Sequence, residues 1–197
     1  MNGQQGLYRS EYEHDACGVG LVADLNGTPS HAIVAAGLTV LKRLMHRGAT
    51  GNDPETGDGA GLLLQIPKAF FRKALGIDGD FGVGMLFGGV GEEAAIEAAV
   101  KKNGCDVLAW REVPTNPDAI GHDARAVMPR IRQLFIDCAD EAVLYKIRRE
   151  IEATTESTYI CSLSSRTIVY KGLLLATQVA KGLSFRQEGG PLLQGRP

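Results

Sequence analysis

One cysteine stands where an N-terminal nucleophile would need to be, between small residues at the start of an apolar segment. Cys17 opens the sequence CGVGLVADL and follows Ala16. If the peptide bond before it were cleaved, one residue would carry both a thiol and an α-amino group. Such an amine titrates near pH ~7.7–8.0, so it could accept the thiol proton while the sulfur attacks an amide or ester carbonyl. The structural alternative is a small buried apolar residue, the commoner role of a lone cysteine.

A second group with possible chemistry follows the first expected helix. Arg47, between His46 and Gly48, precedes the glycine-rich residues 48–61 (GATGNDPETGDGAG). An arginine there could bind a substrate carboxylate through two parallel hydrogen bonds. The alternative is a solvated arginine that interacts favourably with the carbonyl end of the helix. The glycines let the backbone approach a bound group closely, or they form only a tight connection.

The other cysteines indicate neither a metal site nor a disulfide framework. Cys105, Cys138 and Cys161 form no C-x-x-C pair, and the four histidines supply no H-x₃₋₅-H partner. We therefore expect a reducing, intracellular setting, the cytoplasm. Cys138 and Cys161 lie among apolar neighbours, where a buried and inert thiol is expected. Trp110 and Phe135 are expected in the core.

The composition is that of an ordinary globular domain. The chain has 197 residues, of which 44% are hydrophobic and 22% charged, about one domain by length. Its net charge of −2 gives no field that would attract nucleic acid or an anionic membrane. No apolar run approaches the ~18 residues of a membrane span. Glycine is unusually frequent: 25 of the 197 residues are glycine, roughly 13% against a usual share of about 7%.

Helical and strand-like segments alternate along the chain. Residues 17–25 alternate apolar and small side chains, which predicts a strand. The spacing of Val34, Leu38 and Leu41 predicts an amphipathic helix over residues 31–45. Taken alone, this alternation favours βαβ units and a parallel sheet. Further strands are expected at 62–66, 81–87, 106–113 and 130–138, a hairpin at 158–164 with 166–171, and helices at 67–75, 92–102, 140–153 and 173–180, with a loop at 114–129.

Four blocks of the sequence together resemble the N-terminal class II glutamine amidotransferase domain of the glutamate synthase large subunit. They are EHDACGVGLVAD, LKRLMHRGATGNDPETGDGAGLLLQIP, ARAVMPRIRQLF and YICSLSSRTIVYKG, in the family order. The resemblance implies an α+β fold of the N-terminal nucleophile hydrolase type. That fold is a four-layer αββα sandwich with antiparallel sheets, here incomplete, and it replaces the parallel sheet suggested by the alternation alone.

The same resemblance implies an activity and assigns residues to it. Residues 1–16 would be a propeptide removed by self-processing, after which Cys17 attacks the side-chain amide of L-glutamine. Ammonia leaves, and water hydrolyses the glutamyl thioester to glutamate. Arg47 would bind the α-carboxylate of glutamine. The residues expected to shape the pocket are Gly48, Gly57, Asp58 and Gly59.

The full enzymes of this family imply partners and cofactors outside the chain. Their later domains hold flavin mononucleotide (FMN) and an iron–sulfur cluster, and there ammonia reacts with 2-oxoglutarate to give a second glutamate. We expect no cofactor and no metal in the chain itself. Its expected partners are L-glutamine, the synthase domains and the small subunit.

The family pattern ends before the chain does. We expect a partial amidotransferase domain at residues 17–181 and an atypical tail at residues 182–197. The family's Asn-Gly pair of the oxyanion hole and its later amine-binding aspartate have no counterpart, since Asn26-Gly27 and Asn103-Gly104 lie in other contexts. One lost oxyanion donor costs ~10²–10³ in rate. We therefore expect a fragment, a frameshift product or a short paralogue that is impaired or inactive alone.

Two other interpretations remain. The first is a non-catalytic binding or interaction protein with the same fold. Cleavage between Ala16 and Cys17 would argue against it, because an uncleaved chain has no free α-amine at Cys17. The second is a nucleotide-binding loop at residues 82–88 (GVGMLFG), but this segment misses the G-x-G-x-x-G spacing by one residue.

Overall fold

The computed structural model describes residues 17–182, and the predicted propeptide at 1–16 and residues 183–197 of the predicted tail lie outside them. Its strands are β1 (Ala60–Gln65), β2 (Gly82–Gly88), β3 (Val107–Glu112), β4 (Ile131–Ile136), β5 (Thr158–Ser164) and β6 (Thr167–Gly172). Its α-helices are α1 (His31–Arg43), α2 (Lys68–Leu75), α3 (Glu93–Lys102), α4 (His122–Ala126), α5 (Glu141–Thr154) and α6 (Val179–Gly182). Two short 3₁₀ helices are η2 (Met45–Arg47) and η3 (Pro117–Ala119).

The strands form two antiparallel sheets, so the parallel sheet suggested by the alternation is wrong. One sheet has the order β3-β4-β2-β5, and the other pairs β1 with β6. Helix α3 does connect two strands of the same direction, β2 and β3, but β4 is inserted between them. The connection of β4 to β5 through α5 encloses β2 in the same way. This split βαβ arrangement produces a βαβ rhythm in the sequence without any parallel pair.

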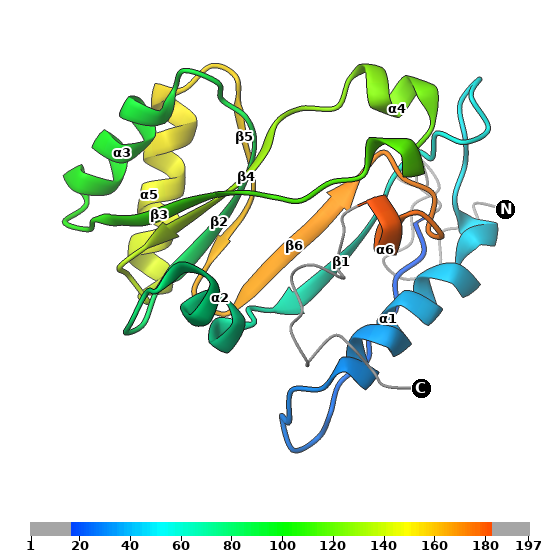
Figure 1. Ribbon diagram of the computed structural model, residues 1–197, viewed down its shortest axis with the longest axis horizontal. Coiled ribbons are helices and arrows are strands. Elements are labelled where there is room, and N and C mark those ends of the chain that lie inside the picture. Colours follow the sequence, from blue (N-terminus) through cyan, green and yellow to red (C-terminus); the bar gives the residue numbers. More distant parts are fainter. Residues whose placement is uncertain (1–16, 183–197) are drawn as a thin grey trace, which may run out of the picture.

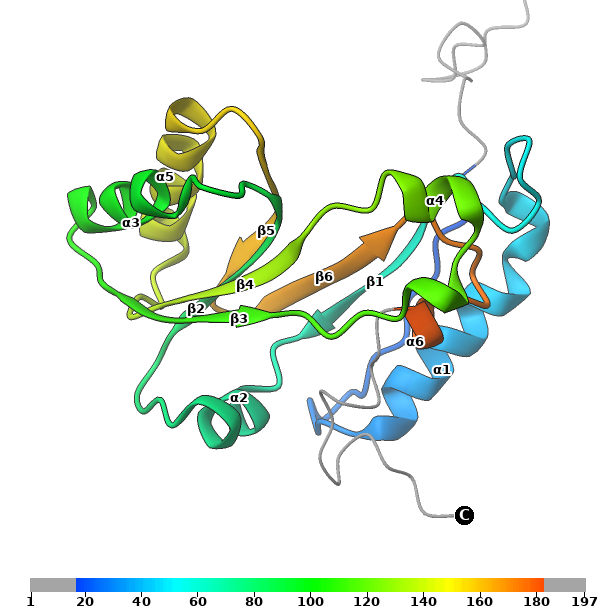
Figure 2. The ribbon, with the colours of Figure 1, turned by 45° about the horizontal axis from the view of Figure 1, so that its top comes forward.

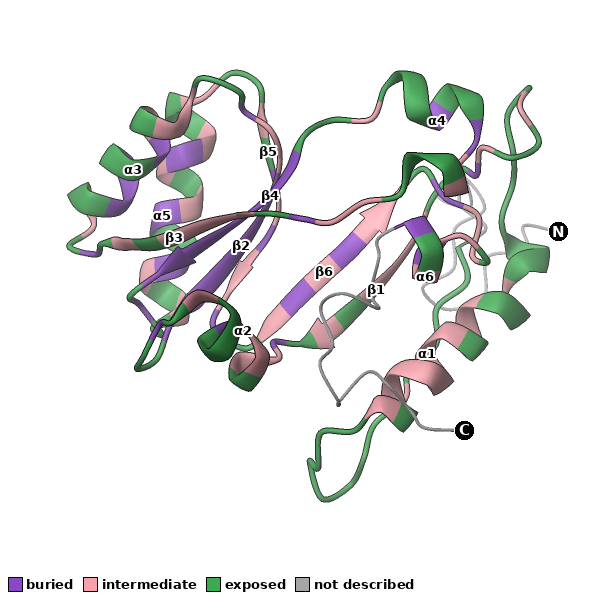
Figure 3. Cartoon of the chain, viewed as in Figure 1, coloured by how far each residue is buried: buried purple, intermediate pink, exposed green. Residues whose placement is uncertain are grey.

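Both faces of the four-stranded sheet are buried, and strand β4 shows this most clearly (Figure 3). Phe135 points into the core between the two sheets, where Tyr170 also lies. Leu134 and Ile136 point into the core beneath α3 and α5. A strand buried on both faces has a continuous apolar run in place of a polar–apolar alternation.

Four layers follow one another across the molecule: α3 with α5, the four-stranded sheet, the two-stranded sheet, and α1 (Figures 1 and 2). Helix α1 lies alongside β1, and its Leu38 and Leu41 pack against the core between the sheets. The α+β class with antiparallel sheets agrees with the expected αββα sandwich in partial form. Within residues 17–182 no helix is long and apolar enough to cross a membrane.

Several helix predictions are confirmed, and their local causes are visible. Ser30 begins α1, where its hydroxyl accepts a hydrogen bond from the amide of Ile33. Asp140 begins α5, where its carboxylate accepts hydrogen bonds from the amides of Ala142 and Val143. The helix predicted over residues 173–180 is wrong for most of its length, since α6 begins only at Val179. The loop predicted over 114–129 contains η3 and α4.

The strand predicted at residues 17–25 is not formed. This segment runs beside α1 and pairs with no strand among the described residues. A strand needs a neighbour for its backbone hydrogen bonds, and an alternating sequence does not supply one. Val19 and Leu21 consequently remain about nine-tenths exposed, at 89% and 90%.

The predicted hairpin is also wrong in its pairing, although both of its strands exist. Strand β5 pairs with β2, whereas β6 pairs with β1 in the other sheet. The connection is nevertheless tight, because the Ser164 hydroxyl accepts hydrogen bonds from the amides of Arg166 and Thr167. The chain therefore passes from one sheet to the other within two residues.

Candidate functional site

The segment that carries Cys17 packs closely against the end of α1. A Cβ atom placed on Gly18 would lie 3.2 Å from the Cβ of Arg47 and 3.3 Å from a methyl carbon of Leu44. A Cβ on Gly20 would overlap the side chain of Val40. The glycines of the CGVG sequence thus allow the backbone to lie against the helix, and they bring Cys17 next to the segment of Arg47.

A second close approach joins Arg47 to the glycine-rich loop. The amide of Asp58 donates a hydrogen bond to the carbonyl of Ala49 at 3.0 Å, and Thr50 forms an isolated bridge with Gly57. A Cβ on Gly48 would lie 3.7 Å from a carboxylate oxygen of Asp58. The residues after η2 therefore run beside residues 57–59, and the six predicted site residues form one continuous series of neighbours.

The loop itself is held against the C-terminal part of the described chain. Gly57 is buried, and a Cβ there would lie 2.5 Å from the carbonyl carbon of Leu174 and 2.7 Å from the amide nitrogen of Leu175. No side chain fits at that distance. Gly59 has φ +146°, a conformation that side chains disfavour. Both glycines are required by the backbone itself, independently of any ligand.

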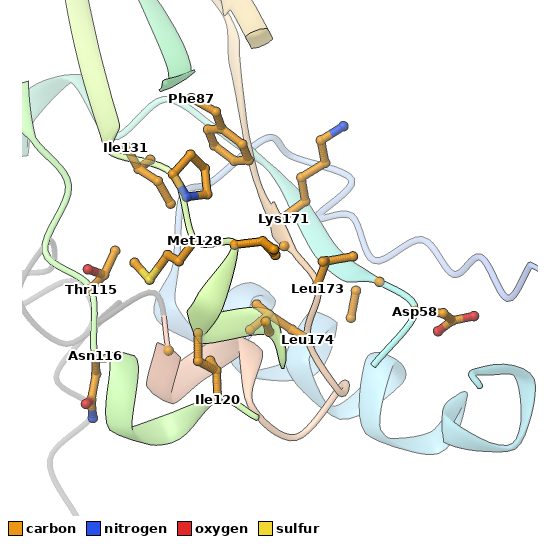
Figure 4. Close-up of a pocket in the computed structure, with 17 residues that line it drawn as sticks. Asp58, Phe87, Thr115, Asn116, Ile120, Met128, Ile131, Lys171, Leu173 and Leu174 are labelled. Atoms are coloured by element: carbon orange, nitrogen blue, oxygen red, sulfur yellow. The ribbon is translucent and has the colours of Figure 1, made fainter. Parts of the chain in front are cut away.

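Next to this loop lies a cavity of about 520 Å³. Its walls are mainly apolar, and Met128, Ile131 and Leu174 contribute to them (Figure 4). Asp58 and Gly59 line one side, and in Figure 4 Asp58 lies apart from the apolar cluster. Cys17, Arg47, Gly48 and Gly57 are not among the lining residues. Cys17 therefore lies outside the lining of this cavity.

Arg47 is a positively charged residue at the surface of this segment. Its side chain is exposed, and within residues 17–182 its guanidinium forms no ion pair or hydrogen bond. An arginine of this kind is available to bind a carboxylate in a two-bond geometry. Asp58 is also exposed, and its backbone amide donates a hydrogen bond to the carbonyl of Ala49.

Cys17 differs from the other three cysteines in its accessibility. It is exposed, whereas Cys105 and Cys138 are buried and Cys161 is half-buried. Burial raises the pKa of the Cys105 thiol to about 11, and its hydrogen bond with the Cys138 thiol is the next largest cause. Burial likewise raises the pKa of Cys161. Cys17 is therefore the thiol best placed to meet a substrate.

Two residues that the sequence did not single out hold the loop in place. Asp53 and Thr56 hydrogen-bond to each other and to backbone amides at the start of α4. Hydrogen bonds lower the pKa of the Asp53 carboxyl. The largest effect comes from the Thr56 hydroxyl and the next from the amide of Glu55. The Asp-Pro-Glu-Thr sequence is typical of a side-chain-stabilised turn, and this is the signal by which Asp53 and Thr56 could have been found.

The described residues do not fit a metal cluster. No three His, Cys, Asp or Glu side chains come together within residues 17–182 in a way that could hold a metal ion. Cys105 and Cys138 interact with each other, and no third cysteine joins them within residues 17–182. A four-thiolate iron–sulfur site would require all four cysteines in one place.

Residues 17–185 match the family model described as glutamine amidotransferases class-II. The match begins at Cys17 and covers most of the chain. It agrees with the family resemblance carried by the four sequence blocks.

Curated relatives point to the same family. The chain is 48% identical, over 89% of its length, to the glutamate synthase [NADPH] large chain of Bacillus subtilis (strain 168). It is 39% identical, over 87% of its length, to the protein of that name from Azospirillum brasilense. It is 42% identical, over 82% of its length, to ferredoxin-dependent glutamate synthase 1 of Arabidopsis thaliana. The matched regions amount to only 12–13% of these relatives' lengths.

Proposed function

The chain belongs to the class-II glutamine amidotransferases, and we propose that it hydrolyses the side-chain amide of L-glutamine with Cys17 as the nucleophile. The observation that carries this proposal is the position of Cys17. It is an exposed thiol at the first residue of the family match. Its neighbour Gly18 lies against the segment of Arg47, whose guanidinium has no ion pair or hydrogen bond within residues 17–182.

The proposed reaction requires removal of residues 1–16, which leaves Cys17 with a free α-amine. The amine accepts the thiol proton, and the sulfur attacks the amide carbon of glutamine. The tetrahedral intermediate collapses when its C–N bond breaks, and the departing nitrogen takes the proton from the amine and leaves as ammonia. Water then attacks the glutamyl thioester, the C–S bond breaks, and glutamate and the thiol are released.

Substrate binding is assigned to the neighbours of Cys17. Arg47 binds the α-carboxylate of glutamine through two hydrogen bonds. Gly48, Gly57, Asp58 and Gly59 shape the pocket, where the backbone of the three glycines can approach the ligand closely. The support for this assignment is the continuous series of contacts from Gly18 to Asp58.

We further propose that this chain alone turns over glutamine slowly. Cys17 is exposed and lies outside the cavity, so a bound amide would face bulk water. A site open to water loses the strengthening of charge stabilisation that a closed active site provides. Fast turnover would require further groups around the Cys17 thiol that exclude water from the bound amide.

In the complete enzymes, the ammonia would serve glutamate synthesis. The chain spans about 13% of its first two relatives, so we propose that FMN and an iron–sulfur cluster are held by other parts of such proteins. The synthase domains and the small subunit are the proposed partners. The relatives' names include both NADPH and ferredoxin, so both kinds of electron donor occur in the family.

A glutaminase assay with paired cysteine variants tests the proposal. Ammonia and glutamate release from L-glutamine should fall to background in Cys17→Ser and persist in Cys161→Ser, which removes a half-buried thiol. Equal activity in Cys17→Ser and the unchanged chain would refute Cys17 as the nucleophile. A chain that binds glutamine without release, and that retains residues 1–16, would favour the non-catalytic binding protein.

A further inference from the structure

The turn at residues 53–56 is organised by one carboxylate. Asp53 accepts hydrogen bonds from the amide of Glu55 at 2.9 Å, the hydroxyl of Thr56 at 2.6 Å and the amide of Asp123 at 3.2 Å. The first two close the turn upon itself. The third joins it to the first turn of α4, 70 positions away in the sequence.

Thr56 makes a second connection to the same helix. Its hydroxyl donates to Asp53 and accepts a hydrogen bond from the amide of Ala124 at 3.1 Å. The contact is close-packed, because a Cβ on Gly121 would lie 2.5 Å from a carboxylate oxygen of Asp53. The hydroxyl thus serves as both donor and acceptor.

A third attachment comes from the segment before α6. The side-chain amide of Gln178 donates to the carbonyl of Glu55 at 2.8 Å, and its oxygen accepts from the amide of Leu175 at 2.8 Å. The turn is therefore fixed on two sides, by α4 and by residues 174–178. Both of these segments contribute walls to the 520 Å³ cavity, through Ala124 and Leu174.

We propose that Asp53 and Thr56 are positioning residues of the glutamine site, which hold the backbone of residues 57–59 at the place where substrate binds. This inference rests on the proposed function. Thr56 is covalently joined to Gly57, so the hydrogen bonds that hold Thr56 act together with the packing of Gly57 against Leu174 to fix residues 57–59. Loss of the Thr56 hydroxyl removes two hydrogen bonds and frees the loop to move away from the ligand.

Amide hydrogen exchange of the whole chain measures the restraint directly. Thr56→Val is isosteric and lacks the hydroxyl, whereas Thr56→Ser keeps it. Exchange at residues 55–59 and 121–124 should be faster in Thr56→Val and close to the unchanged chain in Thr56→Ser. Asp53→Asn provides a second variant, and Asp24→Asn its control, because Asp24 closes a similar turn at residues 24–28. Exchange in β2 and β4 shows whether each variant is folded.

Labelling of Cys17 measures the positioning role. The probe is 6-diazo-5-oxo-L-norleucine, an electrophilic glutamine analogue, and iodoacetamide is the reagent without a glutamine head group. In Thr56→Val the analogue concentration for half-maximal labelling rate should rise roughly tenfold, with little change in the maximal rate. Labelling by iodoacetamide should not change, and Thr56→Ser should restore the analogue's affinity.

The outcomes separate this inference from the proposed function. Unchanged exchange in Thr56→Val, or faster exchange with unchanged analogue affinity, overturns the positioning role alone. An unsubstituted chain that reacts with iodoacetamide at Cys17 but never with the analogue overturns the proposed function, and the positioning role with it.

Discussion

Gly57 lies against the backbone of Leu174 so closely that the two segments leave no space for a side chain between them. A Cβ on Gly57 would be 2.5 Å from the carbonyl carbon of Leu174. This contact joins the glycine-rich loop to the wall of the cavity. The requirement for glycine at position 57 is therefore explained by packing.

The first prediction concerns this contact. Gly57→Ala should destabilise the protein by about 1–3 kcal/mol, because the added methyl forces the two backbone segments apart. Gly51→Ala is the matched control in the same loop, since a Cβ there meets no atom within 4 Å. Urea denaturation measures both variants. Equal midpoints for the two would show that the loop does not pack against Leu174.

A second prediction concerns acid stability at the start of α3. The pKa of the Glu92 carboxyl is lowered from 4.5 to about 2 by hydrogen bonds to the carboxylate. The largest cause is the hydrogen bond from the Thr158 hydroxyl, followed by those from the amides of Glu156 and Ser157. Because the folded value is the lower one, the contribution is complete above pH 4.5 and is lost as pH falls from 4.5 towards 2.

The variant Glu92→Gln should therefore have a lower urea midpoint than the unchanged chain at pH 7. The difference should shrink below pH 4.5 and disappear near pH 2. Glu156→Gln, which alters an exposed carboxylate, should show no such pH-dependent difference. A difference in urea midpoint that stays constant between pH 7 and pH 2 would indicate that Glu92 does not accept hydrogen bonds from these three donors.

The third prediction ranks the thiols. Iodoacetamide at pH 8 should modify Cys17 first, because it is exposed. Cys105 should react at least roughly a hundredfold more slowly, since its raised pKa of about 11 leaves little thiolate. Peptide mapping by mass spectrometry gives the order. Faster modification of Cys105 than of Cys17 would contradict the burial of the cysteine pair.

A fourth prediction tests the core between the sheets. The ring of Phe135 lies 5.0 Å from that of Phe71 and 5.9 Å from that of Phe81. Phe135→Ala should cost about 3–5 kcal/mol of unfolding free energy. Tyr145→Ala, on the exposed side of α5, should cost much less. Similar losses for both would mean that the two sheets do not share this core.

Local features of the fold were predictable from the sequence, and pairings were not. The cap at Asp140 and the helix at residues 31–45 depend on neighbours within a few positions, so the sequence contains their causes. Strand partners depend on residues far away. Residues 17–25 have the pattern of a strand but no partner among the described residues, and β5 and β6 have the pattern of a hairpin but pair in different sheets.

Some residues of the candidate site were likewise predictable from the sequence, and others were not. Cys17, Arg47 and residues 57–59 were identified by resemblance to a family, and the structure brings their segments together. Asp53 and Thr56 were missed because their partners Asp123 and Ala124 lie 70 and 68 positions away. A turn sequence predicts hydrogen bonds within the turn, but it does not predict which distant backbone the turn will meet.

The central claim is that Cys17 is the nucleophile of a glutamine site. Intact mass of the purified chain, before and after incubation with 6-diazo-5-oxo-L-norleucine, tests it most directly. We predict loss of residues 1–16 and a single adduct at Cys17, with slower labelling when L-glutamine is present. A chain that keeps residues 1–16 and takes no adduct at Cys17, although iodoacetamide modifies that thiol, would contradict the account.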